Sequence, residues 1–155
     1  MPRILAVFVL MFGVFAAPLS HAVDVPALTD LHADLTEMQQ RKLPMILLFH
    51  SHGCGYCHYV MEDHLKPMIL SGQYRNRALI RQLEERSGEL VDQDGQVVDA
   101  RDLTRRYKVR FFPTLLILGP DGRVLAEPLV GVANIDLYGS QLESALQKAE
   151  SALKR

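Results

Sequence analysis

The chain lacks the residue patterns that mark several large classes of protein. It has only two cysteines among 155 residues, so it cannot be a small scaffold held together by several disulfides. Its 17 basic and 18 acidic residues nearly balance, which leaves no basic excess of the kind that favours binding to nucleic acid. It has no internal repeat and no low-complexity linker. We therefore expect one folded domain and no nucleic-acid partner.

The apolar run near the N-terminus is too short to cross a membrane. Residues 4–17 make a run of 14 residues, whereas a spanning helix needs about 20. Pro18 ends the run, and Ser20 and Ala22 are small residues at the two positions that a signal peptidase reads. The sequence predicts a cleaved signal peptide, residues 1–22, followed by the domain 23–155. In a bacterium this export leads to the periplasm, where disulfides can form.

No stable membrane anchor is expected, because no cysteine near the cleavage point could carry a lipid. The remaining chain is long enough to bury one core without disulfide support. Apolar periodicity and turn residues predict helices at 27–42, 54–67 (kinked or ended by Pro67), 99–108 and 135–153. They predict strands at 45–49, 78–83, 114–118 and 123–130, and a small hairpin at 90–98 around Asp94-Gly95. This order predicts an α/β fold, with a mixed sheet of about four strands and helices on both faces.

Both cysteines belong to one motif, Cys54-Gly55-Tyr56-Cys57-His58, which directly follows the apolar run 45–49. Two thiols at this spacing can close a disulfide or share a metal ion with nearby histidines, and with His58 they also match the attachment signal of a c-type haem. Small c-type cytochromes are helical, whereas this motif follows a buried strand. No second cluster of metal ligands lies elsewhere in the chain. We therefore expect redox chemistry and no cofactor, with metal or haem binding as the alternative.

The motif and a second segment together resemble the thioredoxin superfamily. A buried strand that runs into Cys-x-x-Cys at a helix start is typical of that family. So is Phe112-Pro113-Thr114 before the strand 115–118, and so are the turn at Asp121-Gly122 and a glycine near Gly131. The resemblance covers roughly residues 27–153. It implies a thioredoxin fold, with a cis proline at Pro113 beside the cysteines.

The chemistry of the motif suggests separate roles for its residues. At a helix N-terminus the pKa of the Cys54 thiol is lowered, which makes Cys54 the attacking sulfur and Cys57 the resolving thiol. Gly55 would let a substrate backbone approach, and Tyr56 would offer an apolar contact. A cis Pro113 would present the backbone of Phe112 to an extended substrate segment.

Four histidines, His50, His52, His58 and His64, lie near the motif in sequence. His52 and His58 lie within a few residues of a thiol and are candidates for adjusting its pKa. His64 lies inside the predicted helix, where we expect a solvated side chain without a role.

The chain also departs from thioredoxin itself. Leu48 stands where thioredoxin has a buried aspartate, and Gly53 replaces the tryptophan before the first cysteine. Glu84, Glu85 or a histidine could take the place of that aspartate as proton acceptor for the resolving thiol.

Among its relatives, the chain looks most like the small exported proteins that keep partner thiols reduced and are recharged by a membrane electron donor. The periplasmic oxidants of the superfamily carry an inserted helical domain between the second cysteine and the cis proline, which this chain is too short to hold. We therefore expect an oxidoreductase that reduces protein disulfides. A thioredoxin-fold module that only binds a client protein is the further alternative.

Overall fold

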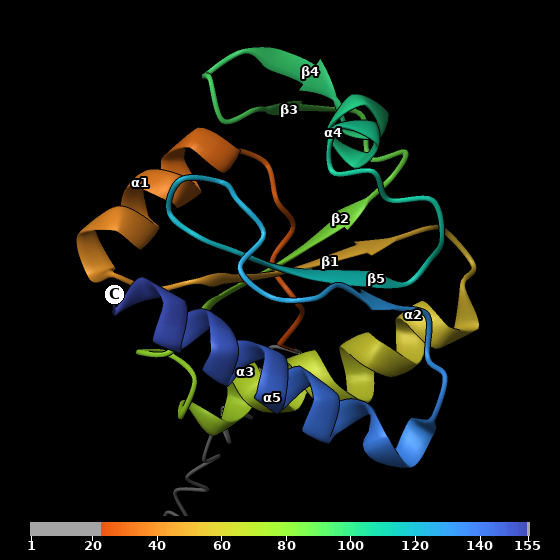
Figure 1. Ribbon diagram of the computed structural model, residues 1–155. Helices are drawn as coiled ribbons and strands as arrows, with labels where there is room; N and C mark the ends of the chain where they lie inside the picture. The colour runs from red at the N-terminus through yellow and green to blue at the C-terminus, as the bar shows by residue number, and fades with distance from the viewer. Residues whose placement is uncertain (1–22, 155) are drawn as a thin grey trace, which may run out of the picture.

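The computed structural model describes residues 23–154, and the predicted signal peptide lies outside them (Figure 1). The helical elements are α1 (Leu31–Arg41), α2 (Gly55–Val60), the π-helical turn η1 (Met61–Leu65), α3 (Lys66–Ser71), α4 (Ala100–Arg106) and α5 (Ile135–Leu153). The strands are β1 (Met45–His50), β2 (Leu79–Glu84), β3 (Glu89–Val91), β4 (Val97–Asp99), β5 (Thr114–Leu118) and β6 (Leu129–Val130). No helix within residues 23–154 is long and apolar enough to cross a membrane.

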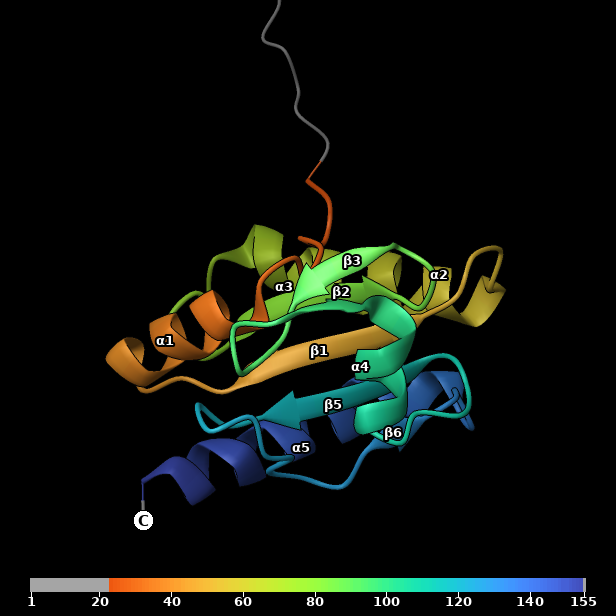
Figure 2. The same cartoon turned by 90° about the horizontal axis from the view of Figure 1, so that it is seen from above.

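The central sheet has four strands in the order β2-β1-β5-β6. Strand β1 runs parallel to β2 and antiparallel to β5, and β5 pairs antiparallel with β6. Helices α2, α3 and α5 cover one face of the sheet, and α1 and α4 cover the other (Figure 1). Figure 2 looks down on the sheet and shows β2, β1 and β5 next to one another. The predicted mixed sheet with helices on both faces is confirmed.

Strand β1 is buried along its whole length, which explains its unbroken apolar sequence. Side chains alternate between the two faces of a strand. Ile46 and Leu48 join the core under α2 and α5, whereas Leu47 and Phe49 join the core under α1 and α4. Strand β1 therefore contributes side chains to both cores, and the cysteine motif directly follows this central strand of the sheet.

Helix α1 begins four residues later than predicted. Asp30 is its N-cap and accepts a hydrogen bond from the backbone N–H of Ala33 at 2.8 Å. The residues before it pair with the outer edge of β2. Leu28 donates its N–H to the carbonyl of Gln82 at 2.8 Å, and Gln82 donates its N–H to the carbonyl of Pro26 at 2.9 Å. The apolar spacing of residues 27–30 thus reflects an edge segment and not a helix turn.

Pro67 does not end the second helix, which corrects one of the two outcomes predicted for it, an end or a kink. The helical path continues through η1 into α3, where Pro67 occupies the first turn, and it ends at Gly72. Proline is tolerated there because its missing N–H falls at a place where the α-helical hydrogen bonds are already interrupted. In the π-turn the N–H of Lys66 reaches the carbonyl of Met61, one residue further back than in an α-helix.

The hairpin at 90–98 is confirmed as β3 and β4, whereas the strand predicted at 123–130 is mostly irregular. Hydrogen bonds from Gly119 to Arg123 and from Leu125 to Ile117 begin the second hairpin. The pairing then breaks and resumes only at Leu129 in β6. Pro128 explains the break, because it has no N–H to donate to a neighbouring strand.

Tyr138 of α5 is buried, with 1% of its surface exposed, and packs against the rings of Tyr59 and His64. Its hydroxyl has no hydrogen-bond partner among the described residues. A buried polar group without a partner lowers stability by its full desolvation cost. The same burial raises the pKa of Tyr138.

We expect Tyr138→Phe to raise the free energy of unfolding by about 1 kcal/mol, because it removes the buried hydroxyl and keeps the ring. Urea denaturation followed by circular dichroism measures the change. Tyr59→Phe is the matched control: the Tyr59 hydroxyl donates to the carbonyl of Ile135 at 3.1 Å, so its loss should lower stability. A lower unfolding midpoint for Tyr138→Phe would contradict the prediction.

Candidate active site

The cysteine motif lies on the turn that leads from β1 into α2. Gly53, with φ of 69°, takes the left-handed conformation that glycine adopts without steric cost. Cys54 follows as the N-cap of α2, so the predicted helix start is confirmed within one residue. The backbone N–H of Cys57 donates to Sγ of Cys54 at 3.2 Å, which directs a main-chain dipole at that sulfur.

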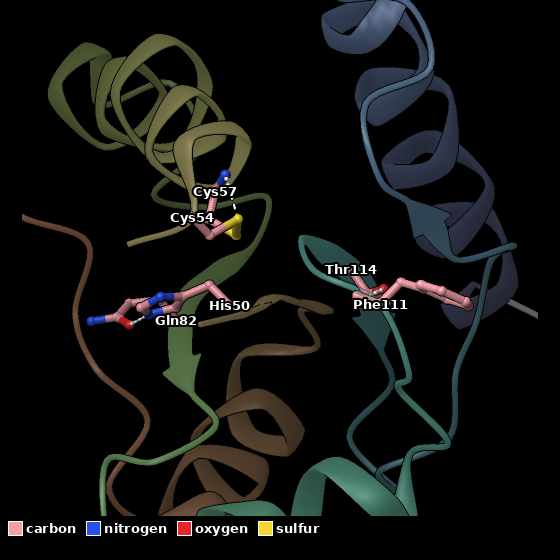
Figure 3. The surroundings of a disulfide bond; sticks show 6 residues. All are labelled: His50, Cys54, Cys57, Gln82, Phe111 and Thr114. Atoms are coloured by element: carbon pink, nitrogen blue, oxygen red, sulfur yellow. Dashed lines mark hydrogen bonds between the residues drawn. A yellow bond between two sulfur atoms is a disulfide. The ribbon is translucent and has the colours of Figure 1, made fainter. Parts of the chain in front are cut away.

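The two sulfurs are bonded to each other, with an S–S distance of 2.08 Å (Figure 3). Cys54 is half-buried, whereas only 1% of Cys57 is exposed. Cys54 is therefore the more accessible of the two cysteines. This asymmetry is what separate attacking and resolving roles require.

A second loop lies at the same edge of the sheet. The antiparallel register pairs Phe49 with Thr114, so the end of β1 and the start of β5 meet there. The Phe112–Pro113 peptide bond before β5 is cis. The carbonyl of Pro113 accepts the N–H of Gly131 at 2.7 Å, and the Thr114 hydroxyl donates to the carbonyl of Phe111 at 2.7 Å. Figure 3 shows Phe111 and Thr114 of this loop in the surroundings of the disulfide.

The predicted substrate contacts have different surroundings. Gly55 and Tyr56 are exposed at the start of α2. The side chain of Phe112 is half-buried and packs against the core under α1 and α4. Phe111 is 68% exposed and was not predicted from the sequence. The sequence signal for an exposed phenylalanine was the consecutive pair before a buried strand. Because side chains alternate in an extended segment, only one of the two can face the core.

The two histidines predicted to adjust the thiol lie at the surface. His52 and His58 line the same hollow as Cys54, Gly55 and Cys57, so the structure does bring them together with the motif. The His58 side chain is 73% exposed, and its Nδ1 lies 3.8 Å from Oε1 of Glu62. An exposed pair of this kind is weakened by water and salt.

His64 is not the solvated residue that the sequence suggested. It is half-buried, and its Nε2 donates to the hydroxyl of Tyr59 at 2.9 Å. Burial lowers the pKa of His64, partly opposed by the carboxylate of Asp63. Because Tyr59 also binds the backbone of α5, His64 helps to join the helical path of α2 to α5.

Two further polar residues belong to the hollow beside the disulfide. His50 and Glu84 line it together with Cys57. Of the three proton acceptors that the sequence suggested, Glu84 and a histidine are thus near the motif. Glu85 instead donates its backbone N–H to the carbonyl of His50 at 3.0 Å.

The metal alternative gains no support from the geometry. Within residues 23–154, no three side chains of His, Cys, Asp or Glu gather in a way that could hold a metal ion. The haem alternative needs both sulfurs for thioether bonds, whereas here they are joined to each other. Thiol–disulfide exchange needs only the two sulfur atoms of Cys54 and Cys57.

The profile of the thioredoxin-like domain family matches residues 31–147, and the chain belongs to this family. Among solved structures it is similar to a protein described as DsbH oxidoreductase, with 17% identity over 84% of this chain and 94% of that one and a TM-score of 0.54. It is also similar to oxidised mitochondrial thioredoxin 3 from Saccharomyces cerevisiae, with 21% identity over 79% of this chain and 93% of that one and a TM-score of 0.51. At these identities the likeness shows the fold. No curated protein sequence matches the chain significantly.

Proposed function

We propose that this protein is a periplasmic thiol–disulfide oxidoreductase that reduces disulfides in partner proteins through Cys54 and Cys57. The observation that carries the proposal is the disulfide at the start of α2, between one partly exposed cysteine and one buried cysteine. Membership of the thioredoxin-like family and the cis Phe112–Pro113 bond support it.

In the proposed reaction the Cys54 thiolate attacks one sulfur of a partner disulfide. A bond forms between Cys54 and that sulfur, the partner disulfide breaks, and the second partner sulfur leaves as a thiolate that takes up a proton. The Cys57 thiol then gives up its proton and attacks Sγ of Cys54. The Cys54–Cys57 disulfide forms and the partner leaves reduced by two electrons.

The residues around the motif have separate roles in this proposal. The N–H of Cys57, which points at Sγ of Cys54, favours the thiolate of the attacking cysteine. Gly55 and the backbone of Phe112, whose peptide bond to Pro113 is cis, receive an extended segment of the partner. Tyr56 and Phe111 offer exposed apolar contacts at the two sides of that segment. His52 and His58 remain candidates for adjusting the reactivity of the Cys54 thiol.

Three further parts of the proposal concern direction and location. Between Cys57 and Pro113 the chain forms only the rest of α2, η1, α3, β2, the β3–β4 hairpin and α4. There is no separate helical domain of the kind that the resemblance associates with periplasmic oxidants, which favours reduction. The signal peptide that the sequence predicts at residues 1–22 is the basis for proposing export to the periplasm. A reductant outside the cytoplasm needs a supply of electrons, for which we propose a membrane electron donor.

The reduction potential of the Cys54–Cys57 pair tests the proposed direction. The purified protein is equilibrated with glutathione buffers of graded redox ratio, and its free thiols are alkylated and counted by mass. We expect a value closer to about −270 mV than to about −120 mV, as for a reductant. A value near the higher figure would make the protein an oxidant, and failure to form the disulfide in any buffer would overturn the redox proposal.

A further inference from the structure

His50 lies on the face of the sheet that carries the disulfide. Along β1 the side chains of Ile46 and Leu48 enter the core under α2, and alternation places His50 next in that row. His50 is 9% exposed. On this face of β1 a buried imidazole therefore follows two apolar side chains. Figure 3 shows this imidazole below the Cys54–Cys57 disulfide.

The imidazole is held by a single side chain, that of Gln82. Nε2 of His50 makes a hydrogen bond with Oε1 of Gln82. An amide oxygen only accepts hydrogen bonds, so Nε2 carries the hydrogen. In the neutral ring the other nitrogen, Nδ1, then has a free lone pair and can take up a proton.

Gln82 is itself fixed by the backbone. Its N–H and its carbonyl both pair with the edge segment, at Pro26 and Leu28. Its side chain points to the face of β2 that also carries Ile80 and Glu84, by the same alternation. The strand therefore presents an acceptor to Nε2 of His50 and leaves the ring little freedom to turn.

Cys57 needs a proton acceptor more than Cys54 does. Its sulfur is almost completely buried, so its thiol cannot lose a proton directly to bulk water. Leu48, on the same row, has no group that can take the proton. His50 lines the hollow that Cys57 also lines, and of the three histidines there it alone is buried and hydrogen-bonded to a side chain.

We infer that His50 accepts the Cys57 proton during resolution of the mixed disulfide, and that Gln82 positions the ring for this transfer. This rests on the proposed function. The proton passes from Sγ of Cys57 to Nδ1 of His50 through one water in the hollow that both residues line. Cys57 then attacks Sγ of Cys54, the bond from Cys54 to the partner sulfur breaks, and the partner thiolate takes up a proton. The imidazolium returns its proton to solvent through the hollow. Glu84, which pairs with His50 in the register of β1 and β2, also lines this hollow.

The test uses an aromatic disulfide, dithiobis(nitrobenzoate), which reports the two steps separately. Reduced protein releases one coloured thiolate when Cys54 attacks and a second when Cys57 resolves the mixed disulfide. In His50→Gln we expect the second release to slow by about 10²-fold while the first changes by less than about twofold. His32→Gln is the matched control, because His32 is exposed on α1 and binds only the backbone of Gln93.

The pH profile separates proton transfer from a structural effect. We expect the wild-type second release to slow as pH falls, because an imidazolium cannot accept the Cys57 proton, and we expect this part of the profile to be lost in His50→Gln. His52, His58 and Glu84 are the other titratable groups of the hollow. The substitutions His52→Gln, His58→Gln and Glu84→Gln should each leave that part of the profile in place.

A second variant tests the positioning step without removing the imidazole. Gln82→Met keeps the size of the side chain and removes the acceptor, so the second release should slow, by less than in His50→Gln. Unchanged second release in a folded His50→Gln protein would overturn the inference, as would equal slowing of both releases. If the wild-type protein releases no second thiolate at all, the proposed function fails instead.

Discussion

Replacement of Cys54 by serine is expected to abolish the reduction of protein disulfides. The hydroxyl of serine cannot form a disulfide, and the remaining thiol, Cys57, is too buried to meet a partner. Turnover with insulin as substrate and an excess of dithiothreitol as reductant should fall to the rate of the reductant alone. Wild-type turnover in Cys54→Ser would exclude the proposed mechanism.

The matched variant is Cys57→Ser, which keeps the accessible sulfur and removes the resolving one. Attack by Cys54 then stops at the mixed disulfide. We expect covalent complexes with partner proteins that survive denaturing electrophoresis and disappear on reduction. A protein that only binds clients would instead retain its partners non-covalently when both cysteines are serine. Comparison of the double variant with Cys57→Ser therefore separates the enzyme from the binding module.

Phe49→Ala is expected to lower the stability of the fold more than any of the other substitutions. Phe49 is fully buried, and its ring packs 5.9 Å from that of Tyr107. Removal of a buried phenylalanine side chain lowers the free energy of unfolding by about 3–5 kcal/mol, because contacts are lost and a cavity remains. This is a large part of the total for an ordinary domain, about 5–15 kcal/mol. Urea denaturation of the oxidised protein measures the change.

Phe111→Ala is the control for the buried phenylalanine. Phe111 is mostly exposed, so its loss should change the unfolding free energy by less than about 0.5 kcal/mol. Its expected effect is on function: the KM for a protein substrate should rise while reduction of a small aromatic disulfide is unchanged. A stability loss similar to that of Phe49→Ala would mean that this side chain packs into the fold.

The sequence predicted most of the fold because its strongest signals are local. The apolar run of β1 and the Asp94-Gly95 turn each identify one kind of element without knowledge of the rest. The errors occurred where a tertiary contact changes the outcome. The segment before α1 has helical spacing, but its N–H and carbonyl groups find partners on β2. Pro67 suggested the end of a helix, because the π-turn that accommodates it has no sequence signal of its own.

The candidate site was predicted in part for the same reason. Cys54, Cys57 and Pro113 are visible as motifs, since their spacing and neighbours are characteristic. The difference between Phe111 and Phe112 depends on which of them meets the core, and this requires the register of β5. The pairing of His50 with Gln82 joins residues 32 positions apart, so only the parallel alignment of β1 and β2 shows it.

The segment that covers β2 also limits how copies of this protein can associate. An open strand at the side of a sheet is a template on which another chain can pair and aggregate. Here one border is occupied by the backbone of Pro26 and Leu28, and the other is β6, which is only two residues long. The molecule can therefore keep apolar side chains such as Phe111 and Tyr56 in contact with solvent while offering little unpaired backbone for self-association.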